Sequence, residues 1–301
     1  MNPWLTQRAV RDLRPGDLAW LAFADDEEQG VIIGPFVGGG LDGEDTVVYV
    51  TDAGPGELPG LAGHAGHAGL AEHADRGRLR LLPWRRAAMR GGHFDPGRML
   101  ATLRAEVDRA VAAGARAVRI TAEMSWAVRD AGVDRVLECE RQFAAAVAAS
   151  TMITAICQVD RRRLTEEEVA ALRGAHEVVV GPDPEFEDPV LRITRTFHPR
   201  GLAIAGELDA ARHAVLAEAL AAVSPPCRER APDAGAQELH LDCAELRFMD
   251  LGALHLLADY ARGRAGRCAL ILDRVPDQLR TIIELVGWER LPGVRLGDVV
   301  P

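Results

Sequence analysis

The sequence predicts an α/β fold built from two domains. Through the first 181 residues, short apolar runs of strand length alternate with runs of helical periodicity, which is typical of a parallel sheet covered by helices on both faces. Residues 181–190, GPDPEFEDPV, then contain three Pro and four acidic residues. Because Pro neither continues a helix nor donates to a β-ladder, residues 182–190 are expected to form a linker. The chain of 301 residues is long enough for a domain on each side, over residues 1–181 and 191–301.

In the first domain, six apolar segments have the length and composition of strands: residues 18–23, 46–51, 78–83, 117–122, 152–159 and 176–181. Helical patterns are found between them, near residues 27–40, 57–74, 95–113, 134–149 and 165–173. Two of these helices have clear start signals. Asp95 stands before Pro96 at one, and Thr165 is followed by three Glu at the other.

The second domain has another order of elements. Along the chain it is predicted as strand 191–197, strand 201–208, helix 210–223, strand 238–241, helix 251–264, strand 268–273 and helix 276–286. Residues 225–236 are rich in Pro and charged residues, so a loop is expected there.

Composition indicates a folded protein that does not bind nucleic acid directly. Hydrophobic residues make up 48% and charged residues 27%, as in ordinary globular chains. The formal net charge of -10 repels phosphate backbones and anionic lipid. Five cysteines without a CxxC pair, and an N-terminus without the apolar core of a signal peptide, predict a cytoplasmic location. Residues 142–159 carry no charge, but their Ala, Gln and Thr content favours a helix and then a strand over a membrane span.

Three motifs suggest binding chemistry, and each has a simpler structural interpretation. The Gly-rich residues 38–43 precede a strand and the chain has no Lys, so a helix C-terminus is favoured over a phosphate loop. His64, His67 and His73 lie among Gly and Ala that fix no ligand geometry, so a surface segment is favoured over a metal site. Residues 76–90 hold six Arg around Trp84, which favours an edge strand and a solvated basic turn over a nucleic-acid contact.

Acidic, aromatic and thiol side chains lie along the predicted strands of the first domain. Because the carboxyl ends of parallel strands face the ligand crevice, we expect a ligand pocket there. Two alternatives stay open: Ser125 capping a helix beside a packed Trp126, and Cys157 as a buried structural cysteine. The candidate pocket residues are Trp20, Glu123, Trp126, Cys157 and Asp160.

Several segments of the first domain together resemble the MEDS domain, a sensory module of regulators of one-carbon and halomethane metabolism. The matching segments are GDLAWLAFADDEE (16–28), PFVGGGLDGEDTVVYV (35–50), GHFDPGRML (92–100), RITAEMSW (119–126), ECE (138–140) and CQVDR (157–161). The resemblance implies a RecA-like, three-layer parallel sheet that lacks the phosphate loop, in agreement with the absence of Lys. The family tends to have His after Gly-Asp, where this chain has Leu18.

The second domain resembles a STAS domain, the fold of anti-sigma-factor antagonists. GELD (206–209) and FMDLGAL (248–254) stand at two of its hallmark strand-to-helix junctions. In members of this family that are phosphorylated, Ser or Thr follows the acid that is here Asp250. Leu251 occupies that place and offers no oxygen nucleophile.

The resemblance implies a bacterial signalling protein, a sensory domain joined to a docking domain that phosphorylation at residue 251 does not switch. The implied partner is an anti-sigma factor or a related histidine-kinase-like ATPase. The surface expected to bind it consists of Glu207, Leu208, Asp209, Asp250, Leu251, Gly252 and Leu254.

Two other interpretations stay open. The first domain could serve as a small-molecule or nucleotide sensor, or as a degenerate ATPase-like enzyme that uses Glu123 and Cys157. The absence of Lys argues against conventional ATP hydrolysis, so no enzymatic activity is expected. The chain could also act only by forming a homodimer. No cofactor follows from the sequence.

Overall fold

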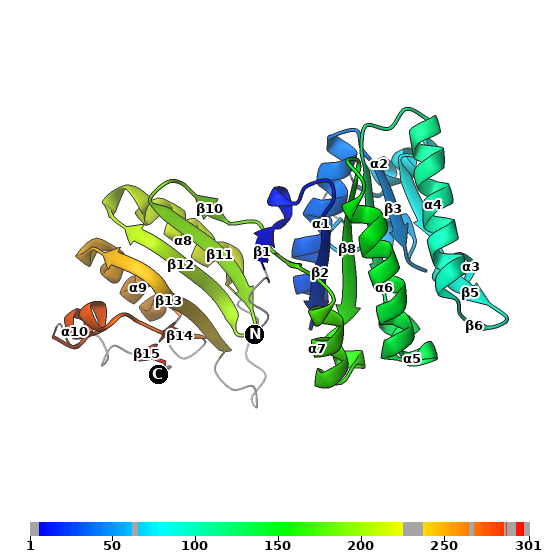
Figure 1. Cartoon of the computed structure of the whole chain (residues 1–301). Coiled ribbons are helices and arrows are strands. Elements are labelled where there is room, and N and C mark those ends of the chain that lie inside the picture. Colours follow the sequence, from blue (N-terminus) through cyan, green and yellow to red (C-terminus); the bar gives the residue numbers. More distant parts are fainter. Residues whose placement is uncertain are drawn as a thin grey trace. The chain divides into compact units, whose positions relative to one another are not determined.

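The computed structural model describes residues 6–61, 66–224, 237–264, 268–285, 287 and 293–297. The chain divides into two compact units, residues 1–183 and 184–301, each with its own sheet (Figure 1).

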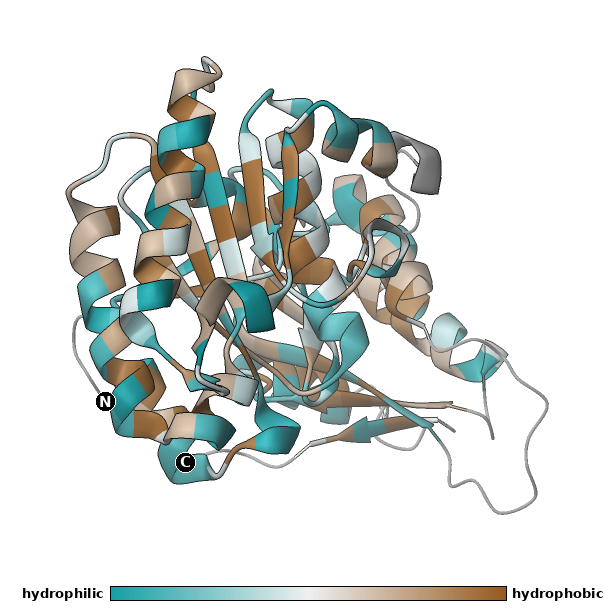
Figure 2. Cartoon of the chain, turned by 90° about the vertical axis from the view of Figure 1, so that its right-hand side faces the viewer, coloured by the Kyte–Doolittle hydropathy of each residue, from teal (hydrophilic) through white to brown (hydrophobic). Residues whose placement is uncertain are grey.

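The N-terminal unit is a three-layer α/β domain around a seven-stranded parallel sheet in the order β1-β9-β2-β8-β7-β3-β4. Its strands are β1 (Thr6–Ala9), β2 (Leu18–Phe23), β3 (Thr46–Val50), β4 (Leu79–Leu82), β7 (Val118–Glu123), β8 (Ile153–Asp160) and β9 (Val178–Gly181). Figure 2 shows hydrophobic residues along these strands, and hydrophobic and hydrophilic residues together on the helices. The predicted α/β class is confirmed, and the six predicted strands of this domain all form.

Helices cover both faces of this sheet. One face packs against α1 (Asp26–Asp42) and α2 (Gly66–Asp75), and their apolar side chains share a core with it. The opposite face packs against α3 (Trp84–Ala88), α4 (Pro96–Ala112), α5 (Ser125–Ala131), α6 (Val133–Ala148) and α7 (Glu166–Gly174). Beside α3 and α5 lies a short hairpin, β5 (Met89–Arg90) and β6 (His93–Phe94).

Local signals explain where these helices begin and end. Asp95 accepts a hydrogen bond from the amide of Arg98 at 2.7 Å, and Thr165 and Glu168 form a capping box, as the sequence predicted. The Gly-rich run closes α1, with Gly43 as its C-cap. Gly34 lets another segment approach the same helix, because a Cβ there would lie 2.8 Å from the carbonyl oxygen of Gly60.

Two predictions for this domain are incomplete. The helix expected over 57–74 is a 3-10 turn, Pro55–Glu57, followed by α2 from Gly66, and residues 62–65 lie outside the described part of the chain. Strand β1 was not predicted because its sequence, TQRA, has no apolar run. Its register with β9 holds it at the sheet edge.

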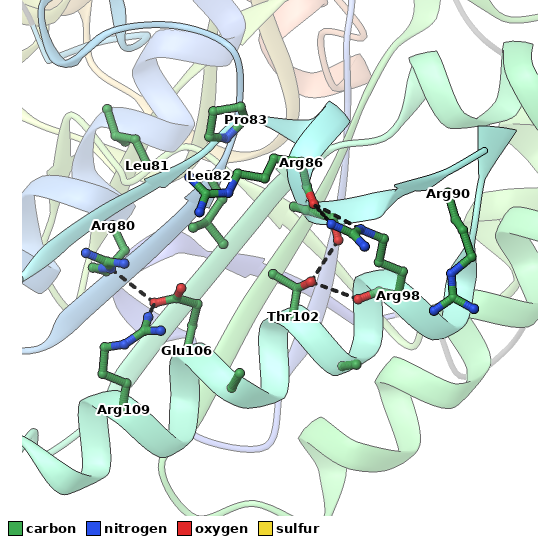
Figure 3. A pocket seen from close by; sticks show the side chains of 13 residues that line it. Arg80, Leu81, Leu82, Pro83, Arg86, Arg90, Arg98, Thr102, Glu106 and Arg109 are labelled. Carbon is green, nitrogen blue, oxygen red and sulfur yellow. Dashed lines mark hydrogen bonds and ion pairs between the residues drawn. The ribbon is translucent and has the colours of Figure 1, made fainter. Parts of the chain in front are cut away.

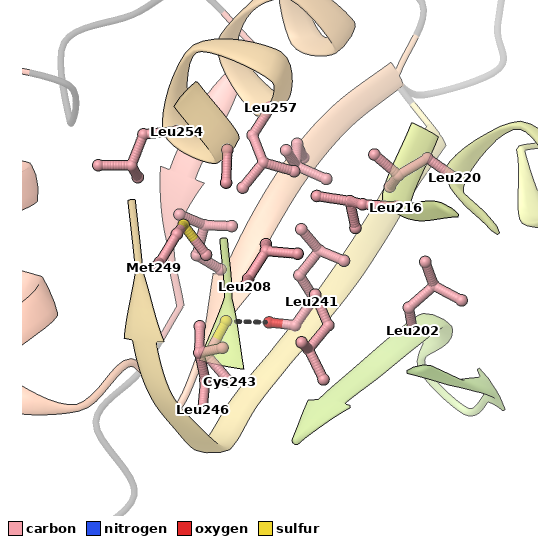
Figure 4. Close-up of a cluster of buried hydrophobic side chains, with 14 of the residues drawn as sticks. Leu202, Leu208, Leu216, Leu220, Leu241, Cys243, Leu246, Met249, Leu254 and Leu257 are labelled. Atoms are coloured by element: carbon pink, nitrogen blue, oxygen red, sulfur yellow. Dashed lines mark hydrogen bonds between the residues drawn. The ribbon is translucent and has the colours of Figure 1, made fainter. Parts of the chain in front are cut away.

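The C-terminal unit is a mixed sheet in the order β10-β11-β12-β13-β14-β15. Strands β10 (Phe186–Glu187), β11 (Leu191–Phe197) and β12 (Arg200–Leu208) pair antiparallel. Strands β13 (Gln237–Met249), β14 (Cys268–Asp273) and β15 (Val294–Leu296) continue from β12 in parallel. Helices α8 (His213–Val223), α9 (Leu251–Gly263) and α10 (Asp277–Leu285) share one core with the strands (Figure 4).

The structure extends the predicted elements of this unit. Strand β13 has 13 residues where only residues 238–241 were expected, because acidic residues on its exposed side interrupt the apolar pattern that marks a strand. Part of the expected linker, residues 186–187, pairs with β11 as β10. Strand β15 was not predicted, and the expected loop 225–236 lies outside the described residues.

Candidate functional site

The two junctions predicted to bind a partner lie side by side at the carboxyl ends of β12 and β13, the two central strands of the C-terminal sheet. Strands β12 and β13 are parallel neighbours, and their register places Leu208 beside Met249. The amide of Asp250 donates to the carbonyl oxygen of Leu208 at 3.1 Å, so the second junction is attached to the first. The carboxylate of Asp250 accepts from the amide of Ala253 at 2.7 Å and caps α9.

Side-chain pairing fixes the geometry of the second junction. His213 Nε2 lies 2.8 Å from Asp250 Oδ1, and Gly252 makes room for this imidazole, since a Cβ at Gly252 would lie 2.4 Å from its Cε1. Burial acts to raise the pKa of Asp250, but hydrogen bonds from the Ala253 amide and from His213 outweigh it and hold the pKa below its usual value. Asp250 is therefore a charged cap at neutral pH.

The residues of the predicted surface differ in exposure. Leu251 is 59% exposed. The position that carries Ser or Thr in phosphorylated STAS domains therefore presents an apolar side chain to solvent. Leu208 and Leu254 are 0% and 2% exposed and belong to the core, which contradicts their assignment to a contact surface (Figure 4). Leu208 faces inward because it alternates with the exposed Glu207 along β12. Leu254 lies on the core-facing side of α9, together with Leu257.

The predicted contact surface did not include one exposed apolar residue beside these junctions. Phe248 is 48% exposed, and it precedes the inward-facing Met249 on β13. Strand alternation could have identified it, because Phe248 must face away from the core once Met249 faces into it. Phe248 and Leu251 are two exposed apolar side chains at this junction. We call them, with the charged residues Glu207 and Asp250, the junction surface.

Charged side chains also connect the predicted linker to the first junction. Arg212 lies 2.8 Å from Asp188 and 2.9 Å from Asp209. The Arg212 guanidinium and the amides of Leu191 and Val190 lower the pKa of Asp188 to about 2. Residue 188 is thus an anchored position at the start of the C-terminal fold.

This contact predicts an acid-sensitive contribution to stability. The folded-state pKa of Asp188, about 2, lies below the ordinary aspartate value of 3.8. Its contribution is therefore present above pH ~4 and is lost as the pH falls through ~2. We expect Asp188→Asn to reduce the pH dependence of unfolding in that window, measured by urea denaturation at a series of pH values. An unchanged slope between pH 4 and 2 would contradict the assignment.

The five candidate pocket residues of the N-terminal unit each contact neighbouring strands, side chains or backbone groups of this unit. Trp20 and Cys157 are register partners on β2 and β8, and both are buried. Trp126 stacks on Trp84 with ring centroids 4.2 Å apart. Glu123 accepts from the amide of Ser125 at 2.7 Å, and Asp160 pairs with Arg162 and Arg163.

None of the three described cavities is lined by more than one of these five residues. The alternative interpretation, in which Ser125 caps the helix after β7, is wrong, because the N-cap of α5 is Met124. Ser125 is the first residue of α5, and its Oγ accepts from the amide of Asp160 at 2.8 Å.

A larger cavity, of about 540 Å³, lies beside the edge strand β4 (Figure 3). Its charged lining consists of Arg80, Arg86, Arg90, Arg98, Arg109 and the single acid Glu106. Burial acts to raise the pKa of Glu106, but its hydrogen bonds with Arg109 and Arg80 outweigh it and hold the pKa below its usual value. The sequence indicated the wall formed by residues 76–90 but not the opposite wall on α4, which is distant along the chain.

The helix start after β2, where a phosphate loop would stand, is occupied by acids of this chain. Asp25 accepts from the amide of Glu28 at 2.8 Å, and Glu28 accepts from the amide of Ala24 at 2.7 Å. These amides are the donors that a phosphate would use, so the turn repels anions and leaves those amides no free hydrogen.

Comparison with known proteins identifies both units. Residues 19–177 match the family model described as MEDS, MEthanogen/methylotroph, DcmR Sensory domain, and residues 191–296 match the model described as Mlab, STAS domain. The chain belongs to the MEDS family and carries a STAS domain after the MEDS domain. This domain pair is that of a signalling and regulatory protein.

The crystal structure of flagellar accessory protein FlaH from Methanocaldococcus jannaschii is 13% identical, with a TM-score of 0.38 over 61% of this chain and 78% of that chain, which is too distant to support an argument. No curated protein matches. Among the described helices, none is both long and apolar enough to cross a bilayer.

Proposed function

We propose that this protein is a non-enzymatic regulator whose STAS domain docks an anti-sigma factor or a related histidine-kinase-like ATPase without being switched by phosphorylation at residue 251. The observation that carries the proposal is the exposed Leu251 at the first position of α9, directly after the capping acid. A phosphoryl group added at a helix N-terminus would place nearly two negative charges there, and leucine cannot accept one.

The junction surface supports binding as well as resistance to phosphorylation. Its two apolar side chains lie beside the charged residues Glu207 and Asp250, and Glu207 lies 3.6 Å from Arg247. An apolar centre with a charged rim is the usual composition of a protein-binding patch. In this proposal the MEDS domain controls the docking, through a ligand or partner with different affinities for two states of the protein.

The test is titration calorimetry of the full chain against candidate anti-sigma factors and kinase-like ATPases encoded in the same genome. We expect saturable binding of at least one of them. Lack of binding across the set would refute the docking function and would leave the fold assignment untouched.

A second candidate function is sensing of a small anionic molecule by the MEDS domain. The cavity beside β4 has a ligand-sized volume of about 540 Å³, and its lining includes five arginines but only one acid. Guanidinium forks suit carboxylates and phosphates. The negative protein therefore has a local site that attracts anions.

This candidate predicts a measurable stabilisation. In a thermal-shift screen of phosphate esters, dicarboxylates and nucleotides, at least one compound should raise the melting temperature, because a ligand of the folded state stabilises it. Arg86→Ala should weaken that compound's binding by about tenfold, since a charge-assisted contact contributes ~1.5 kcal/mol. The matched control is Arg76→Ala, an exposed arginine outside the cavity lining. Equal effects of the two variants would contradict the assignment.

A further inference from the structure

Three buried side chains with different ligand chemistry meet on the α6 face of the N-terminal sheet. Glu140 comes from α6, Cys157 from β8, and His176 from the turn between α7 and β9. They are 4%, 4% and 3% exposed, and one ligand atom from each lies within 4.8 Å of the others. Residues so distant along the chain meet only because β8 and β9 flank β2 and α6 packs over them.

The contacts inside this cluster leave ligand atoms available. Cys157 Sγ lies 2.5 Å from Glu140 Oε1, and His176 Nε2 lies 3.3 Å from Glu140 Oε2. Glu140 Oε2 and His176 Nε2 are buried and contact each other as an ion pair, but this contact lacks the geometry of a hydrogen bond and neither atom has a hydrogen bond elsewhere. Buried polar atoms are nearly always paired, so two such atoms directed at one another require an explanation.

The surroundings of His176 prepare it to bind through Nε2. Its Nδ1 lies 2.9 Å from the carbonyl oxygen of Leu172, and donation along that contact leaves the lone pair on Nε2. A backbone carbonyl on the second nitrogen is the arrangement found behind metal-ligating histidines. The ring of Trp20 lies against the imidazole, with centroids 5.1 Å apart, and limits its rotation.

We propose that Glu140, Cys157 and His176 form a binding site for a borderline divalent cation of the zinc type. Thiolate, imidazole and carboxylate are the three ligand types that zinc takes from proteins, and two anionic ligands neutralise the dication in this buried place. Zinc at ~2.0–2.3 Å from each ligand atom needs separations of roughly 3.3–3.6 Å between them. The Nε2 to Oε2 distance of 3.3 Å already has this value, so Glu140 would bind through Oε2. The 2.5 Å contact of Cys157 Sγ with Oε1 would be given up when metal binding releases the thiol proton.

A fourth coordination position has room beside the cluster. Glu140 and Cys157 line a cavity of about 10 Å³ whose other walls are mostly apolar, including Met99, Leu103 and Phe143. That volume holds about one water molecule. Three protein ligands with one open position are typical of zinc sites that bind an additional molecule, so the fourth ligand would be a water or a small exogenous group.

The test uses the full chain, treated with a chelator and then titrated with Co²⁺ and Zn²⁺. We expect one ion per chain and, with Co²⁺, a thiolate-to-metal charge-transfer absorption. Cys157→Ser should abolish this absorption and weaken zinc binding at least tenfold. Glu140→Gln, which preserves the size of the side chain, should weaken zinc binding and retain the absorption, so the proposal does not depend on the folding of one variant.

Two matched controls locate the site. Cys243→Ser changes a buried free cysteine of the other domain, and His73→Asn changes the His-rich segment, so both should bind like the wild type. Failure of the wild type to bind either ion would overturn the proposal and leave a thiol–carboxylate–imidazole contact without metal. Binding that survives both Cys157→Ser and Glu140→Gln, or that is lost in His73→Asn, would overturn it too.

Discussion

Leu251→Asp is expected to weaken the binding of the STAS domain's partner by at least roughly tenfold. Leu251 is 59% exposed in the free protein, and burying a leucine side chain in an interface contributes ~1.5–3 kcal/mol. Placing a carboxylate where the partner makes an apolar contact should cost ~1.4 kcal/mol or more of binding free energy, which corresponds to a factor of ten in affinity. Acidic residues are favourable at a helix N-terminus, so the fold of α9 should be retained.

The matched control for this variant is Leu285→Asp. Leu285 is 80% exposed on α10, so it tests whether any new charge on an exposed leucine has the same effect. Affinities are measured by calorimetry with the partner found in the screen, and circular dichroism verifies folding. If Leu251→Asp binds as tightly as the wild type, or if both variants lose the same affinity, the junction surface is not where the partner binds.

Gly206→Ala should destabilise the C-terminal unit by about 3 kcal/mol or more. Gly206 has φ of 102°, a backbone conformation that other residues rarely adopt, and a Cβ there would lie 2.0 Å from the carbonyl oxygen of Val190. The strand cannot avoid this contact, because Gly206 is paired with Leu191 in the β11–β12 ladder. Since Glu207 follows directly, the substitution should also disturb the junction surface.

Hydrogen exchange read by mass spectrometry separates the two units in the full chain. Peptides from β12 and β13 should lose protection in Gly206→Ala, while peptides from β2 and β8 should keep it. Gly263→Ala is the control, because Gly263 lies at the end of α9 with open space around its Cβ position. Protection in β12 equal to that of the control would show that the backbone at Gly206 accepts a side chain.

The sequence was most informative where one short segment determines the structure. Strands such as residues 46–50 are apolar on both sides, and helix starts at Asp95 and Thr165 carry their own caps, so both could be predicted. Edge elements could not. Strands β1, β10 and β15 are only four, two and three residues long, which is too short for a recognisable strand pattern, and pairing with a neighbour forms them.

The candidate sites show the same division. The absence of a hydroxyl after Asp250 was visible in the sequence, but the exposure of Phe248 and the burial of Leu254 depended on which face of each element meets the core. The arginine-lined cavity and the Glu140–Cys157–His176 cluster required tertiary contacts between residues far apart in the chain. Cys157 was singled out from its place on a strand, whereas its partners could not be found from spacing.

The central claim is that docking by the STAS domain is independent of phosphorylation at the junction surface. The most direct measurement is the affinity of the full chain for a kinase-active partner with and without prior incubation with Mg-ATP, together with its intact mass. The account predicts equal affinities and an unchanged mass for the wild type, while Leu251→Ser, which restores an oxygen nucleophile, gains one phosphoryl group. A phosphoryl group on the wild-type junction accompanied by loss of binding would contradict it.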